Sequence, residues 1–238
     1  MAHPFAPPTP TTLPIAGDSD RFPVRRIFCV GRNYEDHVVE MGGVPGREDP
    51  FFFGKPADAV WTEENGAAEV AYPPRTENLH HEMELVIAIG TGGTNVAVED
   101  ALDHIYGYAA GVDLTRRDLQ AQAKKGGRPW TMAKGFDVSA PISPIKKAAD
   151  IGHPELGRMW LTVNGDIKQD GDLGQQIWKV PEVVSNLSTY VALQPGDLIM
   201  TGTPAGVGPL EPGDKIEGEI EAIGTITFTM GAKPESVS

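Results

Sequence analysis

Cysteine is almost absent from this chain of 238 residues, in which Cys29 is the only one. A single cysteine cannot form a disulfide within the chain, and it cannot supply the thiolates of a cysteine-based zinc site or iron–sulfur cluster. The fold therefore has no internal disulfide crosslink, and any metal site has to use other ligands.

Positive charge is also in short supply, because 20 lysines and arginines stand against 33 aspartates and glutamates. The formal net charge of −13 argues against binding nucleic acid through its phosphates and against docking on an anionic membrane. It does not exclude a small anionic substrate, because a bound cation and a few basic side chains can reverse the local field.

Long hydrophobic runs are missing as well. No stretch is apolar enough to span a bilayer, and the N-terminus lacks the basic start and apolar run of a secretory signal. We therefore expect a cytoplasmic protein with no membrane partner.

Glycine and proline are abundant, at 28 and 21 residues, which favours many short elements joined by turns. The proline-rich residues 1–22 predict an extended arm with little to contribute to a core, and residues 23–238 predict a single domain. Apolar runs predict buried strands at Phe51–Phe53, Met83–Ile89 and Gly107–Val112.

Helix and turn signals complete the pattern. Strong helix formers predict a helix over Thr115–Lys125, and Pro181 is placed to open a second helix. Asn164-Gly165 between two strand-like runs is a strong hairpin signal. The sum is an α+β domain, rich in β structure and with a few short helices.

Two carboxylates, Glu82 and Glu84, stand one residue apart at the start of the run Met83–Ile89, so both point to the same face of a strand. Asp113 follows the strand-like run Gly107–Val112 and places a third carboxylate where the chain leaves the sheet. Three such oxygen ligands suit Mg²⁺, Mn²⁺ or Ca²⁺. Spacing alone supports an alternative about equally well, in which Glu82 and Glu84 are solvated residues on a sheet edge and Asp113 is only a helix cap.

Arg117 and Gln120 follow Asp113 at i+4 and i+7, which on a helix places all three on one stripe. Such a stripe could hold a metal and an anionic substrate together, although a surface ion pair of Arg117 is the commoner arrangement. Lys134 lies among apolar and aromatic residues, where it must find an anion, shift its pKa or extend its head to water.

His37 and Glu40 are three residues apart in a predicted helix and share a face. A carboxylate beside an imidazole raises its basicity and fixes its tautomer, which activation of a water requires. Taken alone, an exposed helical pair is the commoner reading of this spacing. His80 shares the face of Glu82 and Glu84 and is expected to lie behind them as a supporting residue.

Seven motifs in order resemble the fumarylacetoacetate hydrolase superfamily over about residues 25–230. They are GRNYEDH (31–37) with Glu40, FFFGKP (51–56), HHEMEL (80–85), GVDLTRRDLQ (111–120), WTMAKGFD (130–137), VNGDIKQDG (163–171) and TGTPAGVG (201–208). The resemblance implies a β-rich roll of mixed sheets, a homodimer and Mg²⁺ or Mn²⁺ at the site.

The resemblance also implies roles for single residues. Glu82, Glu84 and Asp113 match the metal ligands, and His37 and Glu40 match the water-activating dyad of the small acylpyruvases, with Lys134 as a further catalytic residue. Positions that match substrate contacts are Arg32, Tyr34, Arg117, Gln120, Lys134 and Thr203.

The implied activity is hydrolysis of a carbon–carbon bond in an acylpyruvate, a small anionic 2-oxo acid. Within the superfamily the chain is most similar to fumarylpyruvate hydrolases of aromatic-acid (gentisate) breakdown, which form fumarate and pyruvate. Oxaloacetate decarboxylases and hydroxymuconate-type isomerases share the same metal ligands and remain alternatives. A non-catalytic β protein whose acidic cluster binds Ca²⁺ is a third, weaker alternative.

Overall fold

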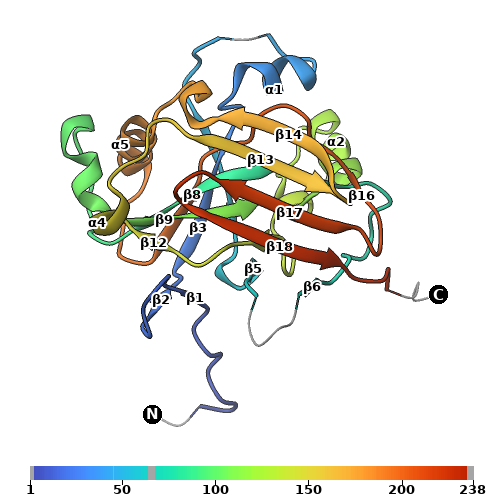
Figure 1. The fold of residues 1–238 in the computed structure, drawn as a ribbon, viewed down its shortest axis with the longest axis horizontal. Helices are drawn as coiled ribbons and strands as arrows, with labels where there is room; N and C mark the ends of the chain where they lie inside the picture. The colour runs from blue at the N-terminus through green and yellow to red at the C-terminus, as the bar shows by residue number, and fades with distance from the viewer. Residues whose placement is uncertain (1–2, 45, 64–67, 235–238) are drawn as a thin grey trace.

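The computed structural model describes residues 3–44, 46–63 and 68–234 of the chain. Strands arranged in two larger sheets dominate it, with small sheets and short helices around them (Figure 1). This confirms the predicted α+β class. In the described part of the chain, no helix has the length and apolar character needed to cross a membrane.

The larger sheet has six strands. In spatial order they are β12 (Lys146–Lys147), β9 (Ile105–Val112), β8 (Met83–Ile89), β15 (Asp197–Met200), β3 (Arg26–Gly31) and β4 (Phe51–Lys55). β8 lies in the middle, antiparallel to both β9 and β15, and all of its residues are buried. Leu85 and Ile87 pack into one core cluster, and Val86 packs into a second one on the other face, as a strand covered on both sides requires.

The second sheet has five strands and lies in front of the first in the view of Figure 1. Its strands are β14 (Asp166–Asp172), β13 (Arg158–Val163), β17 (Lys215–Ile220), β18 (Gly224–Met230) and β6 (Glu69–Val70). The turn between β13 and β14 has positive φ at Asn164 (54°) and Gly165 (86°), which confirms the predicted hairpin. Leu161, Ile216 and Phe228 face the main core that this sheet shares with β8.

Three small sheets complete the strand structure. They are β10 (Thr115–Arg116) with β7 (Leu79–His81) and β16 (Gly208–Leu210), β1 (Thr12–Pro14) with β2 (Arg21–Pro23), and β11 (Ala140–Pro141) with β5 (Val60–Trp61). The α-helices are α1 (Glu35–Glu40), α2 (Arg117–Lys125), α3 (Thr131–Lys134), α4 (Ala148–Ile151) and α5 (Val180–Tyr190). Short 3₁₀ helices cover Ala57–Ala59, Val98–His104 and Leu173–Gln175.

Two expected elements differ in detail from those observed. The strand predicted at Phe51–Phe53 continues to Lys55 as β4, and its phenylalanines are partly exposed because β4 is the edge strand of its sheet. The helix predicted from Thr115 begins at Arg117, because Thr115 and Arg116 pair with β7 in extended conformation. Tertiary strand pairing here overrides local helix propensity.

The N-terminal arm takes more part in the fold than its composition indicates. Thr12–Pro14 pairs with Arg21–Pro23, and Leu13 and Phe22 are buried in the second core cluster. The expectation that residues 1–22 contribute little to a core is therefore wrong for this segment. In Figure 1 β1 and β2 lie at the opposite end of the molecule from α1. Residues 1–2 of the arm, and residues 45, 64–67 and 235–238 of the predicted domain, lie outside the described residues.

Candidate active site

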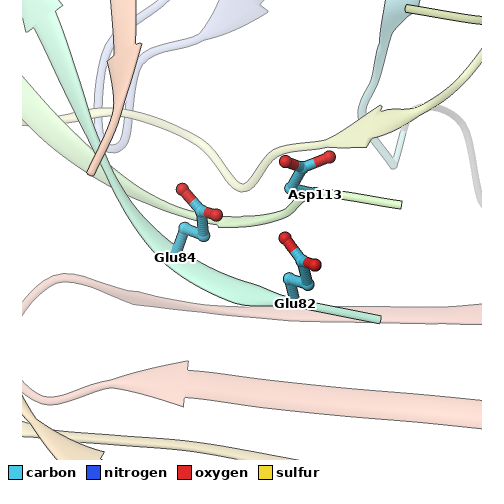
Figure 2. A group of neighbouring side chains, drawn as sticks. All are labelled: Glu82, Glu84 and Asp113. Atoms are coloured by element: carbon cyan, nitrogen blue, oxygen red, sulfur yellow. The ribbon is translucent and has the colours of Figure 1, made fainter. Parts of the chain in front are cut away.

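Three buried carboxylates meet where strands β8 and β9 lie side by side. Glu82 and Glu84 flank the first residue of β8, and Asp113 follows the last residue of β9 (Figure 2). The backbone N–H of Asp113 donates to the carbonyl of Glu82 over 2.8 Å, which fixes the two strand ends together. One oxygen of each carboxylate lies within 4.8 Å of the others. The structure thus brings together the three residues that the sequence singled out as metal ligands.

Two cations expected from the sequence contact this cluster. The Lys134 Nζ lies 2.7 Å from Glu82 Oε2 and 2.7 Å from Asp113 Oδ2, and only 2% of the lysine is exposed. The Arg117 Nη2 lies 2.5 Å from Glu82 Oε1. The Lys134 ammonium is therefore paired with buried carboxylates and does not reach solvent.

A third cation, Lys55, was not predicted. Its Nζ lies 2.8 Å from Asp113 Oδ1 and also donates to the backbone carbonyls of Leu114 and Lys134, and its side chain is fully buried. Lys55 is the last residue of β4, the strand expected to be purely apolar. The available signal was a lysine closing an apolar run directly before a proline, because its charge required a buried partner.

The charges are unevenly compensated. Burial opposes ionisation of Glu82, but Lys134 and Arg117 outweigh it and hold the pKa of that carboxyl below its ordinary value. Burial and the neighbouring Asp113 and Glu82 raise the pKa of Glu84 well above its ordinary value. Its one hydrogen bond within the described residues comes from the Gly202 N–H over 2.8 Å.

These residues fit a divalent cation. The oxygens of Glu82, Glu84 and Asp113 are the hard ligands that Mg²⁺, Mn²⁺ and Ca²⁺ prefer, and they converge within one ligand shell. A bound cation would relieve Glu84, which forms no ion pair with a lysine or arginine among the described residues.

The histidine–glutamate dyad lies on α1, above a cavity that the carboxylate cluster also lines. His37 Nδ1 lies 3.1 Å from Glu40 Oε2, and the other Glu40 oxygen accepts a hydrogen bond from the Gly206 N–H over 3.0 Å. His37 lines the cavity together with Glu82, Glu84 and Lys134. Because the carboxylate accepts the proton of Nδ1, the neutral imidazole has its lone pair on Nε2, where it can accept a proton.

Most of the residues expected to contact substrate also line this cavity. Gln120 accepts a hydrogen bond from Arg117 over 2.7 Å, and Thr203 accepts one from Gln169 over 2.7 Å. Arg32 lies at the mouth. Arg117 reaches Glu82 from the first turn of α2, whereas Asp113 belongs to the strand end, so the predicted single helical stripe with Asp113 is wrong.

Tyr34 and His80 lie away from the cavity. Tyr34 precedes α1, and its side chain packs in the main core with 2% of its surface exposed, so it does not line the cavity as expected. His80 accepts a long hydrogen bond of 3.4 Å from Arg117 Nε, which places it behind the cluster as expected. Burial, reinforced by Arg117, lowers the pKa of His80 to about 4.

Solved structures and curated proteins resemble this chain over most of its length. A fumarylpyruvate hydrolase from Pseudomonas aeruginosa, solved with Mn²⁺ and pyruvate, is 48% identical with a TM-score of 0.95, over 98% of this chain and 100% of that chain. A 2-hydroxyhepta-2,4-diene-1,7-dioate isomerase from Mycobacterium marinum is 35% identical with a TM-score of 0.77, over 94% of this chain and 78% of that chain. The human mitochondrial oxaloacetate tautomerase is 41% identical over 211 residues, which are 89% of this chain and 93% of the human protein.

The relatives thus share one scaffold and differ in the reaction that their names give. The family model described as fumarylacetoacetate (FAA) hydrolase C-terminal matches residues 26–230, which include both the buried carboxylates and the dyad on α1. This chain belongs to the fumarylacetoacetate hydrolase family, whose members include both hydrolases and tautomerases.

Proposed function

We propose that this protein is a metal-dependent hydrolase that cleaves the carbon–carbon bond of an acylpyruvate, with fumarylpyruvate as the best candidate. The observation that carries the proposal is the His37–Glu40 pair, with 3.1 Å between Nδ1 and Oε2, above the cavity that holds the carboxylate cluster. A tautomerisation or decarboxylation needs no attacking water, whereas a hydrolysis does. The dyad therefore favours hydrolysis, and 48% identity to a fumarylpyruvate hydrolase supports the same substrate.

Glu82, Glu84 and Asp113 would hold Mg²⁺ or Mn²⁺, with Ca²⁺ as a weaker candidate. When bound, the cation supplies a Lewis acid beside the carboxylate and keto oxygens of the 2-oxo acid. Arg117 keeps Glu82 ionised for this task, and the Gly202 N–H orients Glu84.

In the proposed reaction, His37, Glu40 and Lys134 transfer protons and stabilise charge. His37 Nε2 takes a proton from a water, and Glu40 stabilises the imidazolium that results. The hydroxide adds to the carbonyl of the acyl group, and the bond between that carbon and the pyruvate methylene breaks. The Lys134 ammonium lies where negative charge develops on the departing pyruvate enolate. A proton returned to the methylene gives pyruvate, and the acyl group leaves as a carboxylic acid.

Substrate binding falls to the other lining residues. We assign Arg117, Gln120 and Thr203 to the 2-oxo acid end because all three line the cavity beside the carboxylates. The family likeness supports a homodimer in the cytoplasm that serves aromatic-acid breakdown. These three features are part of the proposal.

A second candidate is tautomerisation or decarboxylation of oxaloacetate. It is favoured by 41% identity to the human mitochondrial oxaloacetate tautomerase. The third reading, a non-catalytic calcium-binding protein, would be favoured if His37, Glu40 and Lys134 lay far from the carboxylates. His37 and Lys134 line the cavity with Glu82 and Glu84, and Glu40 contacts His37, so we set this reading aside.

The substitution His37→Ala separates the first two candidates. With Mn²⁺ present, the unsubstituted protein is expected to release pyruvate from fumarylpyruvate, followed by absorbance, faster than from acetylpyruvate or fumarylacetoacetate. The His37→Ala variant is expected to lose about 10²- to 10⁴-fold in this rate because the base is removed, and to bind oxalate as before. His104→Ala, away from the cavity, serves as the matched control. Normal hydrolysis by His37→Ala would place the base elsewhere, and turnover of oxaloacetate alone would favour the second candidate.

A further inference from the structure

The mouth of the cavity carries two positive side chains without an anionic partner. Arg32 and Lys124 both line the cavity, yet neither side chain forms an ion pair or a hydrogen bond with any described residue. The two inner cations differ, because Arg117 and Lys134 are both paired with Glu82. The charges of Arg117 and Lys134 are therefore compensated by a carboxylate of the protein. The charges of Arg32 and Lys124 are available for a ligand.

An aromatic wall connects the two outer cations. The Arg32 guanidinium lies 6.0 Å from the ring centre of Phe51, and Lys124 Nζ lies 5.5 Å from that of Trp130. Trp130 packs edge-on against Phe51, with ring centres 5.3 Å apart, and lies 5.6 Å from Phe53. The wall is thus one continuous apolar surface with Arg32 beside Phe51 and Lys124 beside Trp130, and the two cations are near enough for the charge of Arg32 to act on Lys124.

The wall also leads inward to the carboxylate cluster. Lys134 Nζ, which contacts Glu82 and Asp113, lies 5.1 Å from the ring centre of Phe53. A ligand with its polar head at the cluster would therefore lie along Phe53 and Trp130 and point its far end toward Lys124. Two rings in sequence suit a planar chain of several carbons better than a four-carbon acid.

The backbone supports a role for Arg32. Its φ is 60°, a left-handed conformation that costs a residue with a side chain on the order of 1 kcal/mol. Gly31, just before it, makes room for the ring of Phe51, whose Cζ lies 2.1 Å from the position that a Cβ would occupy. The close packing of Phe51 on Gly31 places this stretch of backbone, with its left-handed residue Arg32, beside the aromatic wall.

Lys124 is placed by the helix that also carries Arg117 and Gln120. The three residues recur at helical spacing on α2, and all three line the cavity. Burial lowers the pKa of Lys124, and the positive field of Arg117 and Arg32 lowers it further. An incoming carboxylate would relieve that field.

We propose that Arg32 and Lys124 bind a second carboxylate, at the far end of the substrate, so that the enzyme selects dicarboxylic acylpyruvates over those with a neutral acyl group. This inference rests on the proposed function and names its substrate class. Fumarylpyruvate has the required form, with a conjugated chain for the aromatic wall and a carboxylate at each end. Oxaloacetate has only two carbons between its carboxylates and cannot use the full wall.

The test compares two ligands that lack the cleavable β-diketone. 2-Oxoheptanedioate and 2-oxoheptanoate have the same length and the same 2-oxo acid head, and differ in the distal carboxylate. Their affinities are measured by calorimetry with the Mn²⁺-loaded protein. We expect the unsubstituted protein to prefer the diacid by at least about tenfold, because a hydrogen bond to a charged group is worth about that factor.

Lys124→Gln and Arg32→Gln are each expected to reduce this preference by about tenfold. Lys125→Gln is the matched control, because Lys125 is the next residue of α2 and does not line the cavity. It should leave the preference unchanged. Equal affinities of the unsubstituted protein for the two ligands, or a preference that survives both substitutions, would overturn the proposal.

Hydrolysis is measured separately, so the two proposals fail in different ways. A diacid preference that depends on Lys124 and Arg32, in a protein that cleaves no acylpyruvate, would support the distal site and contradict the hydrolase. Cleavage of fumarylpyruvate and acetylpyruvate at similar rates, without a diacid preference, would contradict the distal site and support the hydrolase.

Discussion

The floor of the cavity and the helix above it are built in different ways. The floor consists of Glu82, Glu84 and Asp113 at the ends of β8 and β9, together with Lys55 from the edge strand β4 and Lys134 from α3. All five residues are buried. Their contacts join segments that are distant in sequence. These groups are therefore held by the whole fold.

Helix α1, with His37 and Glu40, has one turn and a half and few attachments. Asn33 anchors its start through hydrogen bonds to the backbone of Thr201 and Trp178, and Glu40 accepts the Gly206 N–H. Val39 on its outer face is 55% exposed. In terms of the proposed function, the sheet fixes the proposed metal ligands, and a lightly held segment carries the proposed base.

Replacement of the buried Lys55 tests how far the fold depends on the charges of the floor, and it has the largest expected effect. Lys55→Met leaves Asp113 with one of its two cations, and loss of one partner of a buried ion pair costs about 3–5 kcal/mol. Denaturant unfolding of the metal-free protein should show this loss in the free energy of unfolding. Lys168→Met, which breaks an exposed pair with Asp166, is the control and should leave that free energy unchanged. A loss below about 1 kcal/mol for Lys55→Met would show that the floor does not depend on this charge.

A substitution that loosens the attachment of α1 tests the role of this helix and has a smaller expected effect. Glu40→Ala removes both the partner of His37 and the link to Gly206, so the base loses its orientation. The rate of hydrolysis should fall by about 10- to 100-fold, while Mn²⁺ affinity measured by calorimetry stays the same. Glu35→Ala, an exposed change on the same helix, should alter neither quantity. A drop in Mn²⁺ affinity with Glu40→Ala would mean that helix and floor are coupled.

The floor was partly readable from the sequence. Strand alternation placed Glu82 and Glu84 on one face, and the apolar run of β8 predicted its central position. The contact with Asp113 depends on the pairing of β8 with β9, which spacing cannot show, and only the ordered motifs pointed to it. Arg117 was expected beside the cluster for the wrong reason, since it reaches Glu82 from a helix that begins after the Asp113 strand has ended.

The missed residues share a physical cause. Lys55 closes an apolar run, and its buried partner Asp113 lies on a strand that is distant in sequence. Lys124 belongs to a run of helix formers, and only the packing of α2 against the aromatic wall distinguishes it from Lys125. Tyr34 was expected to contact substrate from the family resemblance, but its side chain packs in the core. The direction in which a side chain points from an irregular segment is set by tertiary packing, which a local sequence pattern does not encode.

We propose that acylpyruvate cleavage requires a metal ion bound by the carboxylates of the floor, and a metal titration tests this dependence most directly. The rate of pyruvate release from fumarylpyruvate is followed while Mn²⁺ is added to protein freed of metal by a chelator. We expect a negligible rate without metal, a saturable increase on addition, and no increase in a Glu82→Gln variant that keeps its fold by circular dichroism. Full hydrolysis by the metal-free protein, or normal metal-dependent hydrolysis by Glu82→Gln, would contradict it.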